Sequence, residues 1–186
     1  NNRVGTITTS GTNYRLITNV GASISQGIES YIEFNPVRAF TNSQTTDVIL
    51  FSSYAYTNAT YSSDHKDANT KGKKVENAPT DIFRGGISYG YKNFLITAQL
   101  SFVGASFSDA NNTIAASANG NTGRIPSYSI TDLTASYKFS KIVQLRAGIN
   151  NLLDKRYFTR RAAGYPGPGA LPADGRSFFF TLGAKI

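Results

Sequence analysis

Ser177–Ile186, SFFFTLGAKI, is the stretch that decides the fold class. Successive side chains of a β-strand point to opposite faces, so this stretch has one apolar face and one mixed face. The mixed face ends at Lys185, and the apolar face carries Phe178, Phe180, Leu182, Ala184 and Ile186. This pattern fits a half-buried strand of a soluble sandwich, and it equally fits a strand between lipid and an aqueous lumen.

The same alternation runs through six earlier segments of the chain. In residues 94–104, for example, Ile96 and Leu100 share one face, whereas Thr97 and Gln99 share the other. Helical periodicity is nearly absent, and no run reaches the roughly 18 apolar residues of a membrane-spanning helix. We therefore expect antiparallel strands and no helix, with strands at residues 18–37, 47–61, 82–91, 94–104, 130–139, 143–153 and 177–186.

The connections between these segments alternate between short and long. Short ones follow residues 34, 91 and 139, and long polar ones cover residues 62–80, 105–127 and 154–176. Outer-membrane barrels have this alternation of short periplasmic turns and longer extracellular loops, whereas sandwiches have no reason for it. The last strand would then run towards the periplasm, and residues 3–7 would end an ascending strand that is otherwise missing. We expect the C-terminal part of a larger barrel.

Composition narrows the classes of partner. The net charge is +8, and the chain has no Cys, which excludes disulfides and thiol metal sites. A basic chain suits nucleic acid, an anionic membrane surface or a small anionic ligand. The basic residues do not interleave with aromatic residues along one element, so no nucleic-acid partner is expected.

Four phrases resemble TonB-dependent outer-membrane receptors, in the order in which that family has them. They are NVGASISQGIE (19–29), KKVENAPTDIFRGGISY (73–89), IPSYSITDLTASYKF (125–139) and LRAGINNLLDKRYF (145–158). The resemblance implies an all-β fold, an antiparallel transmembrane β-barrel of 22 strands closed by a plug. Residues 1–186 would form a C-terminal barrel segment of about seven to eight strands, with the plug domain absent from this chain. Such barrels usually end in Phe, and this chain ends in Ile186.

The resemblance also implies a function. A member of this family imports a ferric chelate across the outer membrane of a Gram-negative cell, energised by TonB–ExbB–ExbD acting through the plug. The last loop is similar to receptors for ferric citrate or a related siderophore. No enzyme activity and no cofactor are implied, since the ferric chelate is the transported ligand. The lipid bilayer and lipopolysaccharide would surround the barrel.

Basic residues flank the last long connection, and arginine binds carboxylates through paired hydrogen bonds. Citrate-based chelates are anionic, so this connection is the candidate ligand site. The alternative is that these arginines pair with lipopolysaccharide phosphates or with neighbouring loops. The candidate ligand-binding residues are Arg156, Tyr157, Arg160, Arg161, Tyr165 and Arg176.

Other motifs are interpreted as structural. Asn150, Asn151 and Asp154 suit side-chain hydrogen bonds near a strand end, and Gly27 suits a bulge or a close backbone approach. His65 lies in a polar loop without a cluster of metal ligands, so no catalytic or metal site is expected.

Two alternative functions remain open from the sequence. A complete small outer-membrane barrel with a structural or adhesive role would take its eighth strand from residues 3–17. A soluble β-sandwich binding module would use the same alternation with its polar faces outward.

Overall fold

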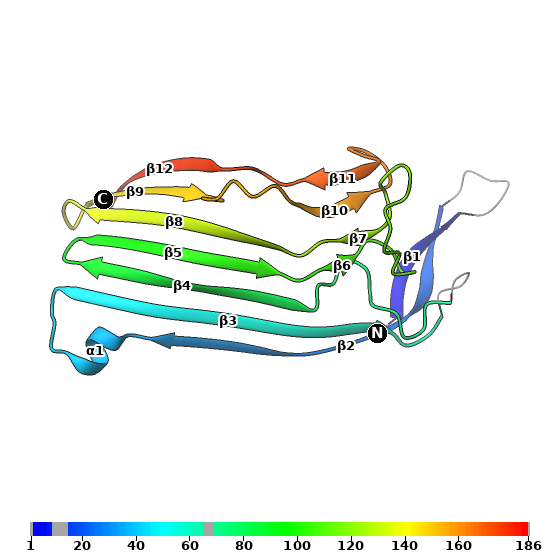
Figure 1. Cartoon of the computed structure of the whole chain (residues 1–186), viewed down its shortest axis with the longest axis horizontal. Coiled ribbons are helices and arrows are strands. Elements are labelled where there is room, and N and C mark those ends of the chain that lie inside the picture. Colours follow the sequence, from blue (N-terminus) through cyan, green and yellow to red (C-terminus); the bar gives the residue numbers. More distant parts are fainter. Residues whose placement is uncertain (1, 9–14, 65–68, 186) are drawn as a thin grey trace.

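A computed structural model describes residues 2–8, 15–64 and 69–185, and no side chains before residue 21. Eight antiparallel strands form one curved sheet (Figure 1). In sheet order they are β1 (Asn2–Thr8), β2 (Arg15–Phe34), β3 (Thr46–Tyr61), β4 (Asp81–Tyr91), β5 (Phe94–Val103), β8 (Tyr128–Lys138), β9 (Val143–Asn150) and β12 (Ser177–Ala184). All seven predicted strands are present, and β1 is the eighth.

Small elements occupy the connections. Two small two-stranded sheets pair β6 (Ser106–Phe107) with β7 (Arg124–Ile125) and β10 (Phe158–Ala162) with β11 (Gly169–Pro172). The expectation of no helix is wrong, because α1 (Pro36–Phe40) follows β2. Among the described residues, no helix is long and apolar enough to cross a membrane.

The α1 turn forms because the chain supplies a cap and a suitable first residue. The Asn35 side chain accepts a hydrogen bond from the Arg38 backbone N–H at 2.9 Å, and Pro36 stands at the helix start, where no donor is needed. Arg38 also forms an ion pair with Asp47 at 2.7 Å, which fixes the turn to the start of β3. The predicted first strand therefore ends at Phe34 and not at residue 37.

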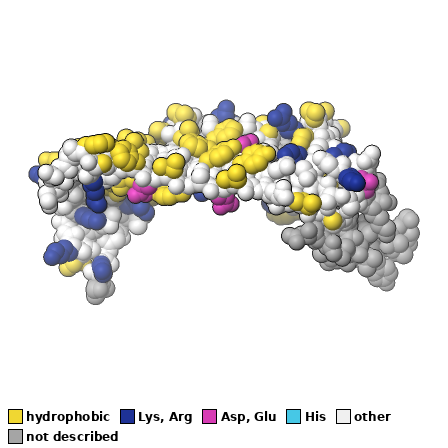
Figure 2. Space-filling view, turned by 90° about the horizontal axis from the view of Figure 1, so that it is seen from below, with side chains coloured by type: hydrophobic (Ala, Val, Ile, Leu, Met, Phe, Trp, Pro, Cys, Tyr) yellow, Lys and Arg dark blue, Asp and Glu magenta, His cyan; other side chains and the backbone are white. Residues whose placement is uncertain are grey.

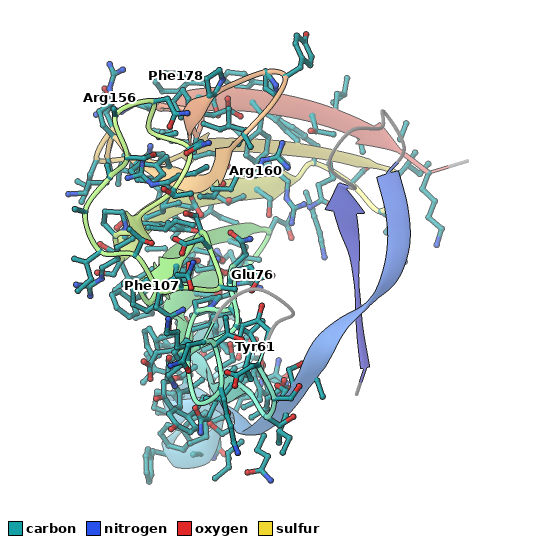
Figure 3. All side chains as sticks on the ribbon, turned by 90° about the vertical axis from the view of Figure 1, so that its right-hand side faces the viewer. Tyr61, Glu76, Phe107, Arg156, Arg160 and Phe178 are labelled. Atoms are coloured by element: carbon teal, nitrogen blue, oxygen red, sulfur yellow. The ribbon has the colours of Figure 1, made fainter. Side chains whose placement is uncertain are left out.

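Backbone pairing aligns the apolar faces of all strands from β2 to β12. One row of register neighbours crosses the sheet from Phe34 through Leu50, Ile87, Ala98, Leu133 and Ile149 to Phe178. Hydrophobic side chains accordingly gather along one side of the sheet (Figure 2), which is its convex side (Figure 3). A slip of one residue in any strand would turn its apolar set to the other face, so the pattern fixes the register.

The apolar face has no protein cover. The side chains of Phe178, Phe180 and Leu182 are 66%, 79% and 73% exposed. Among the described side chains, the buried hydrophobic residues are only Ala59, Tyr61 and Ile125. A soluble protein rarely exposes so large an apolar surface, and we predict that lipid covers this face.

The described structure has neither of the two alternative architectures. A sandwich needs a second sheet against the apolar face, and the described chain places none there. A closed eight-stranded barrel needs its first and last strands to pair, whereas β1 and β12 are opposite edges of an open sheet (Figure 1). Moreover, β1 pairs only with residues 15–22 of β2, and residues 23–34 pair with β3 alone.

Two glycines on the strands lie where neighbouring atoms leave no room for a Cβ atom. A Cβ on Gly27 would lie 2.2 Å from the Tyr56 carbonyl oxygen, and β2 and β3 pair there without a bulge. Gly27 is thus the predicted close backbone approach. On the concave face the Phe179 ring covers its cross-strand partner Gly148, where a Cβ would lie 2.4 Å from the ring.

We predict that Gly27→Ala destabilises the protein by about 1–3 kcal/mol, because the added methyl group meets backbone that cannot rotate away. The measurement is the free energy of unfolding in lipid vesicles from urea titration. Gly183→Ala is the matched control, since its Cβ would have the Gln144 carbonyl oxygen as its nearest neighbour at 3.8 Å. Equal stability of the two variants would contradict the close approach.

A second prediction tests which face lipid covers. Phe180→Lys should cost about 2–4 kcal/mol of unfolding free energy in vesicles, because it places a charge on the lipid face of the sheet. Thr181→Lys, one residue further on the opposite face, should cost much less. Similar losses for both variants would show that the convex face does not contact lipid.

Candidate functional site: the long-loop end of the sheet

Three long connections gather at one end of the sheet, and the short connections lie at the other (Figure 1). The predicted alternation is therefore confirmed. We call them the first long loop (residues 62–80), the second long loop (residues 104–127) and the third long loop (residues 151–176).

The first long loop folds back against the end of β3. The Tyr61 N–H donates to the Lys73 carbonyl oxygen at 2.9 Å, and the Val75 N–H donates to the Ala59 carbonyl oxygen at 3.0 Å. The Tyr61 hydroxyl donates to the Glu76 carboxylate, and both side chains lie on the concave side of the sheet (Figure 3). The loop thereby pairs with the end of β3, which extends beyond the part of the strand that pairs with β4.

The second long loop docks on the first through one asparagine. The Asn112 side-chain oxygen accepts from the Lys74 N–H at 2.7 Å, and its amide nitrogen donates to the Lys74 carbonyl oxygen at 2.8 Å. An additional backbone bond runs from the Asn77 N–H to the Phe107 carbonyl oxygen at 2.7 Å. The amide of Asn112 thus pairs with the Lys74 backbone much as a neighbouring strand would.

The third long loop docks on the second through Arg161. One guanidinium nitrogen donates to the Gly120 carbonyl oxygen at 2.8 Å and another to the Arg124 carbonyl oxygen at 3.4 Å. The same guanidinium lies over the Phe158 ring, 4.9 Å from its centroid. Arg161 therefore contacts a neighbouring loop, which is one of the alternatives to ligand binding that the sequence left open for these arginines.

Asn151 and Asp154 hold the base of the third long loop. Asn151 is 3% exposed, and its side chain accepts from the Lys155 N–H at 2.8 Å and donates to the Lys155 carbonyl oxygen at 3.0 Å. Its backbone N–H donates to the Asp132 carboxylate at 2.8 Å. Asp154 accepts from the Arg176 N–H at 2.9 Å, which joins the two limbs of the loop. The structural interpretation of these residues is confirmed, although β9 ends at Asn150 and not at residue 153.

The other candidate ligand residues lie apart from one another. The Tyr157 ring stacks on Tyr128 with 4.5 Å between centroids, and burial raises the pKa of Tyr157. Tyr165 is fully exposed between β10 and β11. Arg160 lies on the concave side of the sheet, whereas Arg156 lies on the convex side with Phe178 (Figure 3).

Neither the Arg160 nor the Arg156 side chain has a hydrogen bond or ion pair within the described part of the chain. Arg176 is also exposed. Arg161 thus holds the loop, whereas Arg156, Arg160 and Arg176 are exposed and their guanidinium groups can contact other molecules.

The concave face adds charged residues that were not among the candidates. Glu29, Glu33, Arg84 and Arg146 alternate with the apolar positions of β2, β4 and β9 and therefore share this face. Arg146 also lines a cavity of 140 Å³ between β5, β8 and β9. A charge in the middle of a strand is the signal that could have identified them, since only a wetted face tolerates it. His65 lies outside the described residues.

Family comparison agrees with this architecture. Residues 1–152 match the model of the β-barrel of TonB-dependent receptor-like proteins. The chain belongs to that family. Its members are receptors and transporters and not enzymes, and the predicted resemblance and barrel fold class are both confirmed.

Solved structures and a curated relative are similar over this region. The ferric citrate transporter FecA in its unliganded form has a TM-score of 0.79 and 25% identity, over 96% of this chain and 26% of that chain. The siderophore receptor PiuA from Acinetobacter baumannii has a TM-score of 0.66 and 24% identity, over 90% and 22%. The probable TonB-dependent siderophore receptor PiuA of the same species is 43% identical over 65 residues, which are 35% of this chain and 8% of that protein. The chain thus spans about a quarter of the solved receptors.

We predict that Asn151→Ala loosens the third long loop. The change leaves two backbone groups of Lys155 without partners at a buried position, which should cost about 1–3 kcal/mol. The measurement is limited proteolysis of the folded protein in vesicles, with faster cleavage expected within residues 151–176. Asn150→Ala is the matched control, because Asn150 is exposed and its side chain donates only to Ser177 at 3.1 Å. Unchanged cleavage would refute a holding role for Asn151.

Proposed function

We propose that this chain is part of the wall of an outer-membrane receptor that imports a ferric chelate, with ferric citrate or another siderophore as the ligand. The observation that carries the proposal is the two-faced sheet, apolar on its convex side and charged on its concave side, in a chain of this receptor family. A wall between lipid and an aqueous lumen needs both faces. The fold shared with FecA supports ferric citrate as the first ligand to test.

The location and energy source follow from the same proposal. The protein resides in the outer membrane of a Gram-negative cell, with the three long loops outside and the short connections in the periplasm. Import is energised by TonB with ExbB and ExbD, acting on a plug domain in the receptor's lumen. The sheet shown here supplies surface for the ligand and for the plug, and it has no part in energy transduction by itself.

Arg160 is the candidate residue with the best support for ligand contact. The Arg160 side chain is exposed on the concave side of the sheet. The pairing of β10 with β11 has a bulge between Phe158 and Arg160. A guanidinium in this position can donate two parallel hydrogen bonds to a carboxylate of the chelate. Tyr165 and Arg176 are also exposed and could extend the contact. Tyr157 and Arg161 contribute by holding the loop.

The test is binding of radiolabelled ferric citrate to outer membranes from cells that express the protein at the length its gene encodes. Arg160→Gln should weaken binding about tenfold, because a hydrogen bond to a charged group is worth about 1.5–3 kcal/mol. Lys141→Gln, at the opposite end of the sheet, should leave binding unchanged. Absence of saturable binding would refute ferric citrate as ligand, and uptake that persists without TonB would refute the energy source.

A further inference from the structure

Arg146 is a charged residue near the middle of a strand, on the concave face of the sheet. It is the fourth of the eight residues of β9, and its register neighbours are Ser136 on β8 and Thr181 on β12. The Arg146 side chain is exposed, and it has no hydrogen bond or ion pair with the side chains described, those of residues 21–64 and 69–185. Its guanidinium group can therefore bind a ligand from the concave side.

The cavity beside Arg146 collects hydrogen-bond donors from three strands that lie side by side (Figure 1). This cavity of 140 Å³ is lined by Arg146 of β9, Leu95 and Thr97 of β5, and Thr134 and Ser136 of β8. Within the described chain, the hydroxyl groups of Thr134 and Ser136 have no hydrogen-bond partner. One guanidinium and two hydroxyl groups can thus donate into the same small space.

The strands around this cavity place no carboxylate beside Arg146. β5, β9 and β12 contain no Asp or Glu, and the single acid of β8 is Asp132, four residues along the strand from the register partner of Arg146. The Asp132 carboxylate accepts the Asn151 N–H at 2.8 Å. The register row of Arg146 also contains Asp47, but this residue lies four strands away and forms an ion pair with Arg38. The charge of Arg146 is therefore not neutralised by these acids.

The size and the donors of the cavity suit a single carboxylate group. Pockets that enclose a whole small ligand have volumes of about 300–1,000 Å³, so a cavity of 140 Å³ can hold only part of one. A guanidinium group binds a carboxylate through two parallel hydrogen bonds, and hydroxyl groups can donate to the same oxygens. The lining contains no anionic side chain that would repel a carboxylate.

We propose that Arg146, with the hydroxyl groups of Thr134 and Ser136, binds one carboxylate of a small polycarboxylate anion midway along the concave face. The proposal rests on the proposed function, since it takes the concave face to be the wall of an aqueous lumen. It gives an anionic chelate a second contact, nearer to the short connections than Arg160 in the third long loop. A carboxylate side chain from another part of the receptor is the alternative occupant, and the experiment distinguishes the two.

The test uses the protein at the length its gene encodes, in outer membranes, with Thr181→Cys as a reporter beside Arg146. This chain has no other cysteine, and any cysteine elsewhere in the protein is replaced by serine. The labelling rates of the reporter with an anionic and with a cationic methanethiosulfonate reagent are compared. Arg146 should raise the ratio of the anionic to the cationic rate about tenfold over Arg146→Gln, because a charged wall concentrates counter-ions. Arg84→Gln, on the same face but three strands away, is the matched control and should leave the ratio unchanged.

Binding itself is measured as protection of the reporter by iron-free citrate. Citrate should slow labelling by the anionic reagent, and Arg146→Gln should weaken this protection about tenfold, since a charged hydrogen-bonding partner is lost. Arg146→Lys keeps the charge but loses the paired donors, so it should preserve the reagent preference and still weaken protection by citrate. Thr134→Val combined with Ser136→Ala should also weaken protection, although the guanidinium group is intact.

Each outcome supports or overturns the site. Citrate protection that requires Arg146 supports it. Equal labelling ratios in wild type and Arg146→Gln, or protection that Arg146→Gln leaves intact, overturn it. A reporter that neither reagent reaches also overturns it, because another part of the receptor then covers the site. Melting temperatures identify any variant that misfolds, and Arg146→Lys then replaces Arg146→Gln in the protection assay.

Ferric citrate binding is measured in parallel, so that failure of this site and failure of the proposed function can be told apart. Absence of ferric citrate binding in the wild type, with citrate protection that still depends on Arg146, refutes the proposed ligand and leaves this site standing. Normal ferric citrate binding without citrate protection refutes this site alone.

Discussion

The structure depends on one constraint: strands that cross lipid must satisfy their backbone hydrogen bonds with one another while keeping one face apolar. The side-chain period of two and the pairing register must therefore agree in every strand from β2 to β12. The row from Phe34 to Phe178 shows that they do. Every other feature is built on this agreement, because it determines which side chains meet lipid, which meet water and which ends carry the loops.

The interactions that hold the loops in place differ from those that hold the sheet. The loops are held to one another mainly by polar side chains that bond to backbone groups. Asn112 joins the second loop to the first, Arg161 joins the third loop to the second, and Asn151 fixes the base of the third. Each of these bonds contributes only about 1 kcal/mol net, or somewhat more where a charge takes part. Together they join the three long loops into one surface at that end of the sheet.

Much of the fold was predictable because alternation is a local property of the sequence. The faces of β4, β5, β8 and β12 could be read directly, and the lengths of the connections indicated a barrel. The helix α1 was missed because its five residues are too few to show a helical period, although Asn35 and Pro36 are typical start signals. The end of β9 was misplaced because Leu152 and Leu153 continue the apolar run, while the left-handed conformation of Asn151 (φ 51°) ends the strand.

The candidate site was predictable only as a region. The loop contacts join residues about 40 positions apart, such as Asn112 with Lys74 and Arg161 with Gly120, and these meet only after the sheet has formed. Arg156 and Arg160 look alike in sequence, yet they lie on opposite sides of the sheet (Figure 3), and the pairing of β10 with β11 shifts between them.

The contacts between loops also bear on how such a protein can diversify. Asn112 and Arg161 bind the backbone of their partners, and backbone atoms are the same whatever residue stands there. The side chains at Lys74 and Arg124 can therefore be exchanged without removing these bonds, whereas Gly120 has a left-handed backbone (φ 71°) that favours glycine. A lineage could thus vary the exposed residues of these loops while the scaffold that presents them stays in place.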